Sequence, residues 1–261
     1  LFGMSAPGDL SRAKELAEQA VRLSPDLAKA HSALGSTQMI VDARFDAAEK
    51  SFQRALQLDP NHAVAAYRYS LLLNASGRYE EALKLAIRAC ELDPVSPTLG
   101  VQKGLAYYSQ LRFDEAAREF ASVLDRERDF TLAHYYLGLT YGFLRRFGDA
   151  RRHLARAEVS KGTLRTDNAW IDLLEGNPVP AEQSYREMQK LVAEGSVDSS
   201  ALILMAAWLG PPGDALTAIE SSRRNRIGPV LLLRSDPRIT VPLSKHPRFE
   251  SVTAGIGRGW Q

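Results

Sequence analysis

The nine residues RFDAAEKSF, at positions 44–52, recur in closely similar form three more times along this 261-residue chain. The later copies are RYEEALKLA at 78–86, RFDEAAREF at 112–120 and RFGDARRHL at 146–154. Each copy therefore starts 34 residues after the previous one. A fixed period of this length is typical of folds in which one helical unit stacks on the next and shares its core.

Within each copy, apolar residues recur at positions that share one face of an α-helix. An aromatic residue is followed three, seven and ten positions later by small or apolar residues, which is a helical spacing. The aromatic column consists of Phe45, Tyr79, Phe113 and Phe147, and the alanine column consists of Ala48, Ala82, Ala116 and Ala150. The sequence therefore predicts one helix in each copy, with these two columns facing the core.

An earlier helix is expected in each unit. HSALGSTQ at 31–38 and HYYLGLTY at 134–141 share the pattern H-x-x-L-G-x-x-[QY]. Leu34 and Leu137 are 103 residues apart, which is three periods plus one, so the first hinge is predicted to be one residue longer. Proline, which stops a helix, closes three units at Pro25, Pro60 and Pro94. Each unit is therefore expected to be helix, turn, helix and stop.

This pattern resembles the tetratricopeptide repeat over residues 28–157. His31 and His134 stand in the column that the family fills with tryptophan, and Arg128 replaces a closing proline. The resemblance implies an all-α fold, a right-handed superhelical solenoid of antiparallel helical hairpins.

Three segments are expected. Residues 1–160 form the main array, whose first unit is incomplete and is followed by four clear repeats. Residues 161–226 form two divergent repeats, because Ala181 and Ala215 are again 34 residues apart. Residues 227–261 form a short irregular cap that covers the last repeat. The incomplete first unit favours a chain that is part of a longer protein.

The end of the chain carries two similar turns, SDPRI at 235–239 and KHPRF at 245–249. They resemble the paired D-P-R-F-like ends of bacterial tetratricopeptide proteins, although Ile239 stands where phenylalanine is usual. Such proteins often join their repeats to an upstream winged-helix DNA-binding domain or a Ser/Thr kinase domain. Neither domain is visible in these residues.

Composition narrows the function classes. With 33 basic and 31 acidic residues, the net charge of +2 provides no general attraction to nucleic acid or membranes. The single cysteine, Cys90, has no partner for an internal disulfide. No apolar run approaches the roughly 18 residues of a membrane-spanning helix, and no signal peptide is recognisable. The sequence favours a cytoplasmic location and leaves an exported form open.

The sequence predicts no enzyme, no metal site and no cofactor. The five histidines show no H-E-x-x-H motif and no Cys/His spacing of a metal site. The carboxylates recur with the repeat, which favours solvated helix faces over a tuned acid–base pair. Cys90 falls in an interior column and is interpreted as a core thiol. GIGRG at 255–259 follows no predicted strand, so a phosphate loop is not favoured.

The family resemblance implies a partner-binding groove on the inside of the superhelix, lined by the first helix of each unit. The residues expected there are Tyr67, Arg68, Asn74, Gln102, Tyr108, Tyr135, Tyr136 and Phe143. Tyrosines with a few polar groups suit peptide recognition, because they combine large contact area with polar tips. The alternative, that some of these rings pack between repeats, stays open. Lysine and asparagine, which bind chaperone C-termini in one subclass, are replaced at those columns by Ser32, Ser36, Tyr67 and Leu71.

A second candidate surface is basic and is expected on the convex side. It consists of Arg145, Arg146, Arg151, Arg152 and Arg156. A solvated helix face is the simpler interpretation, and a site for an acidic partner is the alternative. No run of aromatic residues accompanies the arginines, so nucleic acid is not favoured as a partner.

The predicted function is a non-catalytic scaffold that binds a protein or peptide in the concave groove. One alternative is the sensory part of a transcription regulator whose DNA-binding domain lies upstream. The other is a structural subunit that associates with copies of itself end to end, since a head-to-tail contact that does not close gives filaments.

Overall fold

The computed structural model describes residues 7–157, 159, 161–196, 199–224, 233–254 and 256. The regular elements of these residues are helices, and none of these helices is both long and apolar enough to cross a membrane. The first helix, α1 (Pro7–Leu23), precedes six antiparallel helical hairpins. The predicted all-α solenoid is confirmed.

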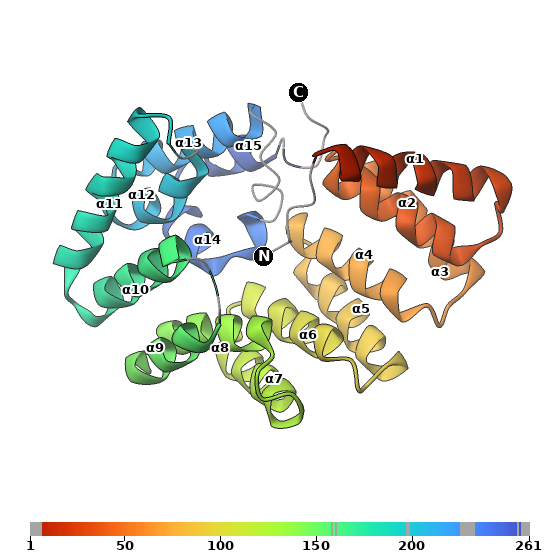
Figure 1. The fold of residues 1–261 in the computed structure, drawn as a ribbon, viewed down its shortest axis with the longest axis horizontal. Helices are drawn as coiled ribbons and strands as arrows, with labels where there is room; N and C mark the ends of the chain where they lie inside the picture. The colour runs from red at the N-terminus through yellow and green to blue at the C-terminus, as the bar shows by residue number, and fades with distance from the viewer. Residues whose placement is uncertain are drawn as a thin grey trace.

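The hairpins follow one another around an open ring, from α1 through α6 to α13 (Figure 1). They are α2 (Ala28–Ile40) with α3 (Phe45–Leu58), α4 (Ala63–Ala75) with α5 (Tyr79–Leu92), α6 (Pro97–Ser109) with α7 (Phe113–Arg126), α8 (Thr131–Phe143) with α9 (Phe147–Arg156), α10 (Lys161–Glu175) with α11 (Pro178–Ala193), and α12 (Ile203–Leu209) with α13 (Pro212–Arg224). The short 3₁₀ helix η1 (Ser199–Leu202) leads into α12. Two further short helices, α14 (Pro237–Leu243) and α15 (Phe249–Thr253), end the described chain.

The second helix of each clear repeat begins at the predicted aromatic residue. The alanine three positions later is fully buried in all four repeats. In the segment predicted to form two divergent repeats, α11 and α13 begin at proline, and Ala181 and Ala215 are likewise fully buried. Proline is tolerated at a helix start because the first turn needs no donor from its nitrogen.

The hinge between the two helices of each clear repeat contains one residue in the left-handed conformation. These residues are Ala43, Gly77, Leu111 and Arg145. The next residue donates its N–H to a carbonyl of the first helix, from Arg78 to Leu73 and from Arg112 to Tyr107, and this closes the last helical turn. Arg44 instead donates to Gln38, six positions back rather than five, so the predicted extra residue in the first hinge is confirmed.

Leu111→Gly is expected to stabilise the chain by about 0.5–1 kcal/mol, because a side chain at positive φ is strained and glycine is not. Leu111 has a φ of 61° and is 50% exposed, so little burial is lost. The measurement is the free energy of unfolding in urea. Gly77→Ala is the matched control at the same hinge position and should destabilise the chain, since its φ is 78°. A destabilised Leu111→Gly chain would contradict the strain at this hinge.

The early and late repeats share one hydrophobic core, which the end of the chain connects. Phe45, Phe52 and Leu72 of the early repeats belong to the same buried cluster as Leu216 and Ile219 of α13. The cluster also includes apolar side chains from the end of the chain, namely Leu233, Ile239, Leu243, Phe249, Val252 and Ile256. Figure 1 shows α14 on the inner side of the ring, between the first and last repeats. The end of the chain therefore does more than cover the last repeat, because it also packs against the start of the array.

Candidate functional site

The inner face of the solenoid holds the final residues of the chain itself. We call the described residues from Leu233 to Ile256 the C-terminal segment. Side chains of four array helices donate hydrogen bonds to its main-chain carbonyls. The donors and acceptors are Tyr79 Oη to Arg234 (2.7 Å), Ser109 Oγ to Ser235 (3.0 Å), Trp208 Nε1 to Arg238 (2.7 Å) and Arg223 Nη1 to Val252 (3.2 Å). These contacts bind the main chain of the segment, in the 3₁₀ turn at 233–235 and in α14, and not its side chains.

One side chain of the segment is bound specifically. Arg238 Nη1 donates to Asp167 Oδ1 of α10 at 2.5 Å, and the guanidinium carbon lies 5.9 Å from the centre of the Trp170 ring. The side chains of Asp167 and Arg238 are 2% and 10% exposed, so this is a buried ion pair. Burial raises the pKa of the Asp167 carboxyl, and the neighbouring guanidinium opposes that rise.

Asp236 forms hydrogen bonds with both the main chain and the side chain of Arg238. Its Oδ1 accepts the Arg238 N–H and so caps the N-terminus of α14. Its carboxylate also accepts from the Arg238 side chain, at 3.1 Å from Nε to Oδ1 and 2.7 Å from Nη2 to Oδ2. Arg238 therefore sits between two carboxylates, one from its own segment and one from the array.

Three of the tyrosines predicted for the groove lie beneath the C-terminal segment. Tyr108 and Tyr135 are 1% and 2% exposed, and Tyr136 is partly buried beside them. Burial raises the pKa of all three phenols, and the charges of Asp236 and Arg238 act on each of them. The structure thus brings these residues together on the inner face, where the segment covers them.

The rings also contact one another between repeats. Tyr108 packs edge-on against Tyr136 and Phe143, with centroids 6.3 and 6.0 Å away. Phe143 contacts Trp170 at 5.0 Å, and Trp170 contacts Trp208 at 6.2 Å. In this structure, Tyr108, Tyr136 and Phe143 therefore pack between repeats, as the alternative interpretation of the sequence had it.

The remaining predicted groove residues are divided between the core and the surface. Asn74 and Gln102 are buried, and Gln102 Nε2 donates to Ser70 Oγ at 3.0 Å. Tyr67 and Arg68 are partly exposed, and Arg68 donates to Ser36 Oγ at 2.6 Å. Tyr67 and Arg68 are therefore the members of this set that a partner could reach with the C-terminal segment in place.

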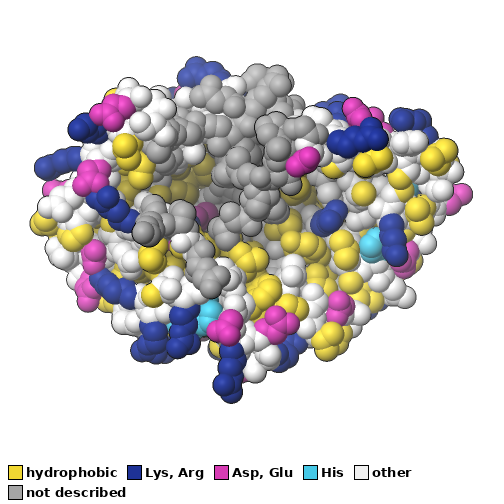
Figure 2. Space-filling model, viewed as in Figure 1, with side chains coloured by type: hydrophobic (Ala, Val, Ile, Leu, Met, Phe, Trp, Pro, Cys, Tyr) yellow, Lys and Arg dark blue, Asp and Glu magenta, His cyan; other side chains and the backbone are white. Residues whose placement is uncertain are grey.

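The arginines predicted for the convex side are largely paired. Arg146 and Arg152 both contact Asp149, at 2.6 and 2.8 Å, and Arg151 forms ion pairs with two carboxylates of α10. Arg145 lies over the Phe147 ring. Arg156 is exposed at the end of α9. Figure 2 shows basic side chains gathered near α9, with acidic side chains among them, so the patch is a mixed surface more than a uniform positive field.

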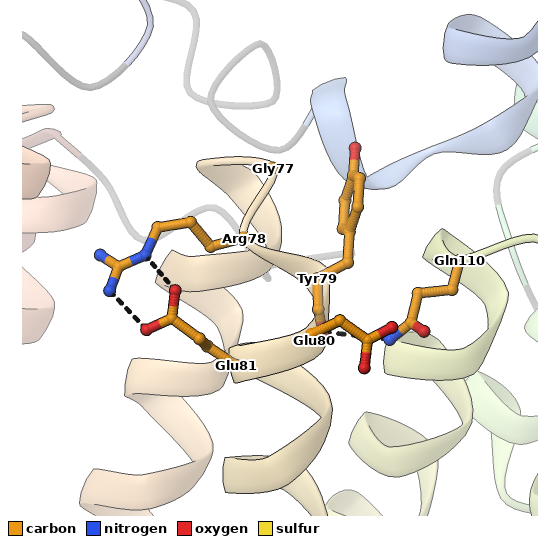
Figure 3. Close-up of a pocket in the computed structure, with 6 residues that line it drawn as sticks. All are labelled: Gly77, Arg78, Tyr79, Glu80, Glu81 and Gln110. Atoms are coloured by element: carbon orange, nitrogen blue, oxygen red, sulfur yellow. Dashed lines mark hydrogen bonds and ion pairs between the residues drawn. The ribbon is translucent and has the colours of Figure 1, made fainter.

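A surface pocket of about 460 Å³ lies at the turn between α4 and α5 (Figure 3). Arg78 and Glu81 pair along one wall at 2.7 Å, and Gln110 donates to the Tyr79 carbonyl. The Tyr79 ring points out of the pocket toward the C-terminal segment. Equivalent pairs recur as Arg112–Glu115 and Arg146–Asp149. The ion pair on this wall is therefore a feature of the repeat.

Two of the histidines and Cys90 lie within hydrogen-bonding distance of main-chain carbonyls. His31 Nε2 and His134 Nε2 each lie within hydrogen-bonding distance of a carbonyl six residues earlier, that of Pro25 (2.7 Å) and that of Arg128 (2.8 Å). Cys90 donates its S–H to the Leu99 carbonyl, and burial raises the thiol pKa to about 11, which disfavours the thiolate. Among the described residues, no three His, Cys, Asp or Glu side chains gather as a metal site. Apart from Ile256, the GIGRG run lies outside the described residues.

Acidification is expected to destabilise the fold through His153. Its Nδ1 lies 2.9 Å from His134 Nδ1, and burial, His134 and two neighbouring arginines lower its pKa from 6.5 to about 4, with Asp149 opposing. The unfolded chain then binds the proton more readily, so stability falls between pH 6.5 and about pH 4. Because the ring is partly exposed, we expect a loss of about 1 kcal/mol between pH 7 and pH 5.

Urea unfolding at these two pH values measures this effect, with His153→Gln as the matched control. Burial lowers the pKa of His62 as well, so the quantity to compare is the pH dependence of the parent minus that of the variant. Equal pH dependence of the two chains would contradict the assignment to His153.

Four residues that organise the inner face were not identified from the sequence. Asp167, Trp170 and Trp208 lie in the divergent repeats, where no column aligns them with the clear units. Arg238 belongs to the SDPRI turn, for which the sequence predicted only a role in covering the last repeat. An acidic residue three positions before a tryptophan, in a helix that faces the solenoid interior, was the available signal.

Comparison with known proteins confirms the repeats. Residues 42–97 and residues 101–162 each match a family model of the tetratricopeptide repeat, so the chain carries these repeats there. Proteins with such repeats generally act as protein-interaction scaffolds. No curated protein matches the chain.

Solved structures of low identity share the fold. The crystal structure of PilW, a type IV pilus biogenesis factor, matches with a TM-score of 0.61 and 21% identity over 70% of this chain and 86% of that one. PilF of Pseudomonas aeruginosa matches with a TM-score of 0.56 and 20% identity, covering 70% and 85% of the two chains. The crystal structure of the APC/C hetero-tetramer Cut9–Hcn1 matches with a TM-score of 0.63 and 16% identity, covering 87% of this chain and 46% of that one.

Proposed function

We propose that this chain is a scaffold that binds a segment of a partner protein on the concave face of its tetratricopeptide repeats. The observation that supports this most directly is the C-terminal segment, which the inner face holds through side-chain hydrogen bonds to the main-chain carbonyls of Arg234, Ser235 and Arg238. A surface that binds part of its own chain in this way has the donors that an external segment needs. The partly exposed residues Tyr67 and Arg68 would extend this surface toward the early repeats.

The test compares the concave and convex faces with one purified partner. A partner is first isolated by pull-down and identified by mass spectrometry, and its affinity is then measured by calorimetry. We expect Tyr67→Ala or Arg68→Ala to weaken binding at least tenfold, since aromatic and arginine anchors dominate interfaces. Arg151→Ala/Arg152→Ala, on the convex side, should alter mainly the salt dependence of association. If Arg151→Ala/Arg152→Ala abolished binding while Tyr67→Ala and Arg68→Ala left the affinity unchanged, the binding site would be on the convex face.

A second candidate function is self-association through α1. Leu16 and Leu23 of this helix are 48% and 74% exposed, and Leu27 beyond it is 47% exposed. Three large apolar side chains at one end of a solenoid favour contact with another molecule. Light scattering over a range of concentrations tests this, and Leu16→Glu/Leu23→Glu should reduce the mass to that of one chain. A parent that stays monomeric throughout would exclude this candidate.

A further inference from the structure

The inner face contains a receptacle for an arginine side chain. Asp167 projects from α10 as a carboxylate that is 2% exposed, and the Trp170 ring lies one helical turn further along. A guanidinium fits both groups, because it donates to a carboxylate and stacks on an aromatic ring. Lysine fits less well, since its compact and strongly hydrated ammonium can neither fork nor stack.

An empty receptacle would be unstable. Without a cation, the carboxyl of Asp167 would be left buried with no opposite charge beside it and with the Tyr135 side chain as a neutral hydrogen-bond partner, which is costly whether it ionises or takes up a proton. The receptacle is therefore suited to exchanging one arginine for another, rather than to standing open. Whatever displaces Arg238 has to bring an arginine of its own.

The residues next to Arg238 in the sequence indicate which kind of segment the site would bind. An acidic residue two positions earlier supports the guanidinium from the segment side. An isoleucine directly after it, Ile239, is buried in the shared core. The main chain is held just before this stretch, at Arg234 and Ser235, and within it, at Arg238.

We propose that the concave face at α10 and α12 recognises an arginine in a partner segment of the type acid-x-Arg-apolar, and that the chain's own segment occupies this site in cis. This rests on the proposed function, since it names the occupant of the same face. Partner binding is then a competition in which the external segment replaces Ser235–Ile239. The C-terminal segment acts as an internal competitor that lowers the apparent affinity for the partner.

The test uses the full chain and a fluorescent peptide with the sequence of residues 233–243, LRSDPRITVPL. Three chains are compared: the parent, Arg238→Lys and Arg238→Ala. We expect the peptide to bind Arg238→Ala at least tenfold more tightly than the parent, with Arg238→Lys between them. The matched probe replaces the peptide arginine that corresponds to Arg238 by citrulline and keeps the one that corresponds to Arg234. Citrulline keeps the shape and removes the charge, so this probe should bind at least tenfold more weakly. Asp167→Asn added to Arg238→Ala should abolish the preference for arginine over citrulline.

Circular dichroism establishes that each variant is folded before binding is measured. If Arg238→Ala is unfolded, Arg238→Lys keeps the charge and provides the test by itself. The proposal is overturned if the folded variants bind the peptide no better than the parent, or if citrulline and arginine peptides bind alike. A partner that depends on Tyr67 and Arg68 but binds parent and Asp167→Asn chains equally would overturn this inference and leave the proposed function standing.

Discussion

Asp167→Ala is expected to destabilise the chain by about 3–5 kcal/mol, which is the usual cost of removing one member of a buried ion pair. The change leaves the guanidinium of Arg238 inside the ring, where its remaining partner is Asp236 of the same segment. The cost should be global, because Arg238 lies in the segment that connects the early and late repeats. Urea unfolding, followed by circular dichroism, measures the change.

The matched control removes both charges. Asp167→Ala/Arg238→Met should lie within about 1–2 kcal/mol of the parent, since apolar groups can replace a buried pair at little cost. Glu250→Ala, which breaks the ion pair between exposed Glu250 and Arg234, should cost at most about 1 kcal/mol. If Asp167→Ala were as mild as Glu250→Ala, the segment would not be anchored by this pair.

Phe120→Ala is expected to cost about 3–5 kcal/mol, because it empties a fully buried ring site. Phe120 stacks on Tyr136, with centroids 5.9 Å apart, and fills the space that the missing side chain of Gly104 leaves. A Cβ on Gly104 would lie 2.4 Å from Phe120 Cε1, well inside contact distance. The glycine on the first helix is therefore required by the ring on the second helix.

A double-mutant cycle isolates this pairing. Gly104→Ala alone should cost about 1–3 kcal/mol through overpacking. In the Phe120→Ala background the same change should be neutral or stabilising, because the clash is gone and alanine favours the helix. Gly148→Ala on α9 is the control, since a Cβ there meets nothing within 4 Å. Additive costs in the cycle would show that the glycine serves another purpose.

The candidate site was only partly accessible from the sequence. The resemblance predicted Tyr108, Tyr135 and Tyr136 as residues of a partner-binding groove, and in the structure all three phenols are buried to the degree that their pKa values rise, close to the charges of Asp236 and Arg238. It did not indicate what covers them. Column-by-column reasoning assigns a face to each residue of a regular repeat, but it carries no information about a segment that lies outside the period.

The sequence by itself determined the repeating unit. Helix starts, buried alanines and the longer first hinge all follow from contacts within about 34 residues, where helical spacing and turn geometry leave few alternatives. Only the tertiary structure decided how the array is closed. Arg238 and Asp167 are 71 residues apart and occur once each, so no periodicity marks them as partners. Their pairing depends on the curvature accumulated over several hairpins, which brings α10 and α12 to the place where the end of the chain returns.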